Sequence, residues 1–118
     1  MAEKRNLERF RKRFTIRFGV GELQFKGFTE DISTTGLFIK TAKPPNPGSL
    51  VMVELLLDEQ RSVQVEARVM WAKKYPPQLV HLVKKGGMGV RIVRFIHGEA
   101  DYLELCEELS LPYAELVF

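Results

Sequence analysis

The chain has 118 residues with a formal net charge of +3, and 45% of its residues are hydrophobic. This length fits one domain with its own core, and the single cysteine excludes an internal disulfide. No Cys/His cluster has the spacing of a metal site, and no apolar run suits a signal peptide or a membrane-spanning helix. We therefore expect a cytoplasmic protein that does not insert into a membrane.

Positive charge is concentrated at the N-terminus. Residues 1–17 contain seven Lys and Arg against two Glu, a net charge of +5, which leaves −2 for the rest of the chain. This asymmetry favours an arm that contacts an anion, whether a nucleotide, a nucleic acid or a lipid headgroup. A solvated basic tail without a partner fits the charge equally well. In either case we expect residues 1–13 to form a flexible basic arm.

Alternation of apolar and polar residues predicts six strands after the arm. We place them, separated by turns rich in Gly and Pro, at 14–18, 23–32, 37–39, 50–57, 63–71 and 88–95. The clearest alternation runs from Val63 to Trp71, so we expect Trp71 to belong to the core. Six strands with short connections favour a closed antiparallel barrel, since closure removes the edges that an open sheet exposes.

The hydrophobic period changes near the C-terminus. The apolar residues from Tyr102 to Leu109 follow helical spacing, and most residues between them are acidic. Pro112 limits this helix, which we expect at about 98–110. The prediction is therefore an all-β domain over 14–118, a six-stranded antiparallel barrel with one C-terminal helix packed against it.

Two short motifs carry groups suited to a guanine nucleotide. Arg5-Asn6-Leu7-Glu8-Arg9 places two arginines four residues apart, and Asp31-Ile32-Ser33-Thr34-Thr35-Gly36 lies where the second predicted strand ends. Guanidinium groups bind phosphates and purine edges, and a carboxylate accepts hydrogen bonds from guanine N–H donors. In a strand, Asp31 and Ser33 project to the same side and so address one ligand edge. Gly36 lets the backbone turn or approach a ligand without a Cβ.

Each motif also has a simpler interpretation. Taken without the first motif, Asp31 and Ser33 favour a turn in which they cap local backbone N–H groups. Arginines at positions 5, 9, 13 and 17 offer more than one pair at the same spacing. Arg17 alternates with apolar residues in the first predicted strand, so we expect it to face solvent. From the residues alone, the pairs Arg5/Arg9 and Arg9/Arg13 both remain open.

In this order, on a chain that reads as all-β, the motifs resemble the PilZ domain, a receptor domain for the bacterial second messenger cyclic di-GMP. The later stretch Gly87-Met88-Gly89-Val90-Arg91 resembles the sixth-strand motif of that family, and the resemblance spans roughly residues 3–110. The family's spacing between its arginine pair and its DxSxxG motif favours Arg5/Arg9. The alternative register replaces Arg5 with Arg13.

The resemblance implies a non-catalytic receptor for cyclic di-GMP, with no further cofactor or metal. Arg5 and Arg9 would contact phosphate and guanine. Asp31 and Ser33 would hold the guanine edge from the barrel, and Gly36 would allow the close approach. The arm would become ordered around the ligand and change the surface offered to a downstream protein, in the regulation of motility or biofilm formation.

Two other functions are compatible with such a chain. Some divergent members of the PilZ fold act as protein adaptors without binding nucleotide, and here the acidic helix face and the apolar tail 111–118 would dock the partner. A small nucleic-acid-binding barrel would also carry a basic arm. We do not expect nucleic acid, because the predicted strands lack an exposed aromatic platform and the body is net acidic. Catalysis is not expected either, since the sequence has no nucleophile elbow and no phosphate-binding glycine loop.

Overall fold

The computed structural model of the chain describes residues 9–74 and 86–110. These residues form β1 (Phe10–Arg11), β2 (Thr15–Gly19), β3 (Phe25–Ile32), β4 (Gly36–Lys40), β5 (Leu50–Leu56), β6 (Ser62–Lys73), β7 (Gly87–His97) and α2 (Glu99–Leu109). The six predicted strands and the C-terminal helix are confirmed, with strand ends within two residues of the expected positions.

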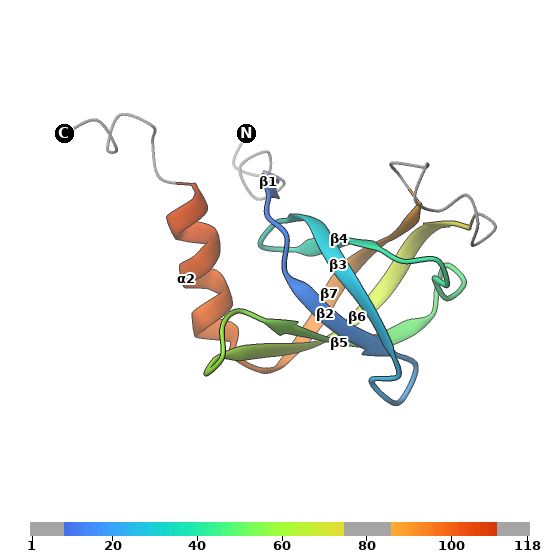
Figure 1. Cartoon of the computed structure of the whole chain (residues 1–118), viewed down its shortest axis with the longest axis horizontal. Helices are drawn as coiled ribbons and strands as arrows, with labels where there is room; N and C mark the ends of the chain where they lie inside the picture. The colour runs from blue at the N-terminus through green and yellow to red at the C-terminus, as the bar shows by residue number, and fades with distance from the viewer. Residues whose placement is uncertain (1–8, 75–85, 111–118) are drawn as a thin grey trace.

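Strands β2 to β7 form a closed antiparallel barrel (Figure 1). Hydrogen-bonded neighbours follow the order β3-β2-β5-β6-β7-β4, and the pairing of β4 with β3 closes the ring. All of these pairings are antiparallel. The predicted fold class is therefore confirmed.

Part of the basic N-terminal segment joins the sheet. β1 pairs with the end of β3, along the same edge that β2 uses. The buried side chain of Thr29 holds the residues that follow β1. Its Oγ1 accepts a hydrogen bond from the N–H of Phe14 and donates one to the carbonyl of Lys12, both at 2.7 Å. Residues 10–14 are thereby held against β3, and they include part of the arm expected at 1–13.

The core follows the predicted alternation along β6 as far as Val69. β5 and β6 bury alternate residues that face each other across the ladder, as with Val51 opposite Ala67. Each aliphatic side chain withdrawn from water in this way contributes roughly 1.5–3 kcal/mol. The ladder between β6 and β7 shifts register between Val69 and Trp71. Trp71 leaves the buried row and is only partly buried, so the prediction that it belongs to the core is wrong.

Helix α2 lies beside the barrel (Figure 1). Its buried residues are Tyr102 and Cys106. The Tyr102 ring lies 5.6 Å from the ring of Phe95, and its hydroxyl donates a hydrogen bond to the carbonyl of Ser33. Burial raises the pKa of Tyr102, so the phenol stays protonated as a donor. The helix therefore anchors the turn between β3 and β4. Among the described residues, no helix has the length and apolar character needed to span a bilayer.

Candidate functional site

The turn between β3 and β4 is organised by the side chain of Ser33, which is 6% exposed. Its Oγ accepts hydrogen bonds from the N–H of Gly36 at 3.1 Å and the N–H of Thr35 at 3.3 Å. The Ser33 N–H donates to the carbonyl of Gly36 at 2.9 Å, which closes the turn. Ser33 thus caps backbone N–H groups of the turn, as serine side chains in turns commonly do. This bonding fixes the shape of the loop that carries the DxSxxG motif.

Gly36 allows β4 to approach β7 closely. A Cβ at this position would collide with the carbonyl oxygen of Val90. Because the obstacle is backbone, no side-chain rearrangement relieves the collision. Gly36 lies opposite Arg91 in the β4–β7 ladder, so the close pairing brings the Ser33 turn beside Arg91.

A pocket of about 310 Å³ opens beside this turn. We call it the Arg9 pocket. It is lined by Arg9, the residue directly before β1, and by the β3–β4 turn. Trp71 of β6 and Arg91 of β7 also line it. Three residues of the predicted site, Arg9, Ser33 and Gly36, therefore line one pocket although they come from two separate motifs.

The charge of the Arg9 pocket suits an anion. Arg9 and Arg91 are both exposed, and none of the described residues that line the pocket carries a carboxylate. Within the described residues neither guanidinium takes part in an ion pair. Uncompensated guanidinium groups at one pocket bind phosphate through charge-assisted, often bidentate hydrogen bonds. In the described parts of the chain, no group of three or more His, Cys, Asp or Glu residues is placed to hold a metal ion.

Trp71 supplies a flat aromatic wall to the pocket. Its ring packs against Phe38 with the two centroids 5.2 Å apart. The indole also covers Gly89, its partner across the ladder, where a Cβ would collide with the ring. These two contacts hold an indole that lines the pocket and suits stacking on a purine. Alternation does not predict that Trp71 lines a pocket. The sequence signal for this position is Gly89, because a glycine in a strand leaves room for a bulky neighbour.

Asp31 lies near the Arg9 pocket in sequence but does not line it. It is partly buried in β3 and sits opposite Phe38 of β4. The β3–β4 ladder shifts register between Thr29 and Asp31, and Ser33 lies beyond the end of β3 in the turn. The regular alternation that predicts Asp31 and Ser33 on one side of a strand is therefore interrupted here.

The arginines of the two possible registers are placed differently. Arg13 lines another pocket, with its guanidinium 4.2 Å from the ring centroid of Phe28. Of the described arginines in these registers, Arg9 and not Arg13 lines the pocket of the Ser33 turn. Arg5 lies outside the described residues, so its expected contact with a ligand remains a prediction.

Comparison with known proteins relates this barrel to one family. The PilZ domain model matches residues 3–107. The Bacillus subtilis inhibitor of motility (MotI/DgrA) is similar in structure, with a TM-score of 0.65 and 18% identity over 85% of this chain and 47% of that protein. The PilZ domain of CeSA from a cellulose-synthesizing bacterium has a TM-score of 0.58 and 18% identity, over 86% of this chain and 97% of that domain.

The matches differ in how much of each protein they cover and in sequence identity. The chain spans about half the length of the MotI/DgrA protein, and at 18% identity both likenesses concern the fold. No curated protein sequence matches the chain. The family model, in contrast, covers nearly the whole chain, including the Ser33 turn and the strands that frame the Arg9 pocket. The chain belongs to the PilZ domain family.

Proposed function

We propose that this chain is a receptor for cyclic di-GMP and that the nucleotide binds in the Arg9 pocket. The observation that carries the proposal is the convergence of Arg9, Ser33 and Gly36 on one pocket. That pocket also contains a second arginine and an indole. Cyclic di-GMP presents two phosphates, which guanidiniums bind, and two guanines, which stack on an aromatic ring.

The proposed roles divide between phosphate and base. Arg9 and Arg91 bind phosphate oxygens, and the indole of Trp71 stacks on a guanine. Asp31 accepts hydrogen bonds from the guanine N–H donors at the adjoining end of β3. Arg5, four residues before Arg9, adds a second guanidinium from the N-terminal segment.

Binding is proposed to act through the N-terminal segment, without catalysis. Residues 10–14 are held against β3 by Thr29, and Arg9 lies directly before them. A ligand that engages Arg9 orders the preceding residues against the Ser33 turn. The surface offered to a downstream protein changes as a result.

Isothermal titration calorimetry with cyclic di-GMP tests this proposal and measures the stoichiometry. We expect saturable binding to the wild-type chain, by one nucleotide or by an intercalated pair. Arg91→Ala should weaken binding about tenfold to over a hundredfold, because a charge-assisted contact contributes about 1.5–3 kcal/mol. Arg94→Ala is the matched control, since Arg94 is exposed on the same strand and pairs with Glu66 outside the pocket. Absence of heat at ligand concentrations of hundreds of micromolar would overturn the proposal.

A further inference from the structure

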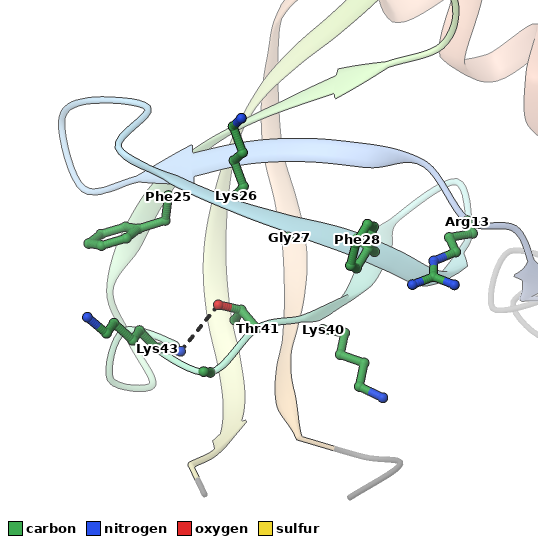
Figure 2. A pocket seen from close by; sticks show the side chains of 9 residues that line it. Arg13, Phe25, Lys26, Gly27, Phe28, Lys40, Thr41 and Lys43 are labelled. Carbon is green, nitrogen blue, oxygen red and sulfur yellow. Dashed lines mark hydrogen bonds between the residues drawn. The ribbon is translucent and has the colours of Figure 1, made fainter. Parts of the chain in front are cut away.

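A second pocket, of about 600 Å³, opens between β3 and the segment that follows β4 (Figure 2). We call it the Phe28 pocket. It is lined by Arg13, by residues 25–28 and by residues 40–43. Among the described residues the two pockets have no lining residue in common, so the proposed receptor function leaves the Phe28 pocket unused.

The Phe28 pocket exists because β3 and β4 diverge. Their ladder begins at Phe28 opposite Lys40, whereas residues 25–27 have ladder partners on β2 alone. Beyond Lys40 the chain turns away from β3, and Thr41 Oγ1 accepts a hydrogen bond from the N–H of Lys43 at 3.2 Å. Figure 2 shows these two segments separating, with the pocket between them.

Two phenyl rings are partly exposed at this pocket. Phe25 is 38% exposed and Phe28 is 40% exposed. Phe25 is supported by Phe18, with ring centroids 5.5 Å apart, and Phe28 by the guanidinium of Arg13. The expectation that the strands lack an exposed aromatic platform is therefore wrong. Alternation cannot reveal it, because Phe25 is exposed by its place at the open end of β3.

Cations accompany the rings, and the described residues that line the pocket include no carboxylate. The positively charged lining residues are Arg13, Lys26, Lys40 and Lys43. In Figure 2, Lys40 and Lys43 extend from the segment opposite β3, whereas Lys26 projects away from that segment. Within the described residues none of the four takes part in an ion pair. The local charge is therefore positive, although the body beyond the arm is net acidic.

We propose that the Phe28 pocket binds single-stranded nucleic acid. Each nucleotide brings one phosphate and one flat base, and the pocket pairs uncompensated cations with two exposed rings. Bases stack on Phe25 and Phe28, while phosphates contact Arg13, Lys40 and Lys43. An acidic peptide would satisfy the cations, but its side chains would leave the rings without stacking partners. The combination of rings and cations therefore favours the polynucleotide.

Fluorescence anisotropy with a labelled short oligothymidylate, without cyclic dinucleotide, tests this proposal. If three cations each contact a phosphate, the slope of log affinity against log salt should be about −2, since each contact to a single strand contributes about −0.7. Phe28→Ala should weaken binding roughly fivefold to 150-fold, the range for loss of one stacked base. A slope near zero, or full affinity in a folded Phe28→Ala chain, would overturn the proposal.

A pair of double variants locates the binding. Lys40→Gln/Lys43→Gln removes two charges at the pocket, and Arg61→Gln/Arg94→Gln removes two exposed charges elsewhere on the barrel. We expect the first to lower affinity roughly tenfold and to reduce the slope by about 1.4, and the second to change neither. Equal losses in the two variants would assign the binding to overall charge and overturn the proposal.

Two further experiments distinguish nucleic acid from an acidic peptide and the Phe28 pocket from the Arg9 pocket. A labelled polyglutamate peptide that bound more tightly than the oligothymidylate would assign the pocket to acidic protein and overturn the proposal. Cyclic di-GMP titration of Lys40→Gln/Lys43→Gln should match the wild-type chain, because these lysines lie outside the Arg9 pocket. Failure at one pocket is thereby distinguishable from failure at the other.

Discussion

Arg9 and Arg13 stand four residues apart and serve two different surfaces. Arg9 lines the pocket of the Ser33 turn, and Arg13 stacks on Phe28 at the other pocket. The stretch between them is held along one edge of β3, which carries the two side chains to different places. Arginine spacing alone therefore does not define a site, because strand pairing decides which surface each guanidinium reaches.

The two pockets also differ in construction. The Arg9 pocket is framed by backbone, in the hydrogen-bonded Ser33 turn and the close β4–β7 pairing at Gly36. The Phe28 pocket is framed by diverging strands and by side chains at the surface. Substitutions in the first should therefore affect folding as well as binding, whereas those in the second should affect mainly binding.

The largest expected effect compares a glycine from each pocket. Gly36→Ala should lower the free energy of unfolding by about 3 kcal/mol, because its Cβ meets a backbone carbonyl that cannot move aside. Gly27→Ala should cost less, about 1 kcal/mol, since its Cβ would lie 2.9 Å from the carbonyl oxygen of Lys40. Urea unfolding measures both, and a Gly36→Ala chain as stable as wild type would contradict the close pairing described for β4 and β7.

The next comparison removes one aromatic ring from each pocket. Trp71→Ala should weaken cyclic di-GMP binding roughly fivefold to 150-fold, because it removes the proposed stacking surface. Phe28→Ala should leave that affinity unchanged, since Phe28 lies at the other pocket. Calorimetric titration of the two variants checks this, and equal losses would show that the pockets do not act separately.

A smaller effect is expected where α2 supports the Ser33 turn. Tyr102→Phe removes the donor to the buried carbonyl of Ser33 and should lower the free energy of unfolding by about 1–2 kcal/mol. Urea unfolding at neutral pH measures this loss. Ser110→Ala, which removes an exposed hydroxyl that donates to the carbonyl of Glu107 at the helix end, is the control and should cost less.

The same tyrosine predicts a pH dependence. Burial raises the pKa of Tyr102 in the folded chain above the value near 10 for an exposed phenol. Its contribution to stability is therefore complete below about pH 10 and decreases as the pH rises further, when the unfolded chain ionises first. Wild-type stability should fall more steeply above pH 10 than that of Tyr102→Phe. Parallel pH profiles for the two chains would contradict a buried phenol.

Most of the barrel could be predicted because its signals are local. The alternation from Val63 to Val69 indicates which face of β6 is buried. Ser33 and Gly36, residue types that favour turns, indicate the position of the turn between β3 and β4. These residues report on the backbone next to them. The same holds for the helical spacing around Tyr102.

The remaining features depend on pairings between distant strands. The register shift that moves Trp71 out of the core and into the Arg9 pocket arises in the ladder with β7. The exposure of Phe25 depends on where the β3–β4 ladder begins. Alternation does not predict the pairing of β1 with β3, because the two residues of β1 lie in a run of basic residues. No local pattern determines these contacts.

The most direct test of the central claim is a paired titration of Arg9→Ala and Arg13→Ala with cyclic di-GMP. Both variants remove one guanidinium from the same short segment, so they match in charge. We expect Arg9→Ala to lose about tenfold to over a hundredfold in affinity, as expected for a charge-assisted contact, and Arg13→Ala to bind like the wild-type chain. Full affinity in Arg9→Ala, or a larger loss in Arg13→Ala, would contradict the assignment of the two arginines to separate pockets.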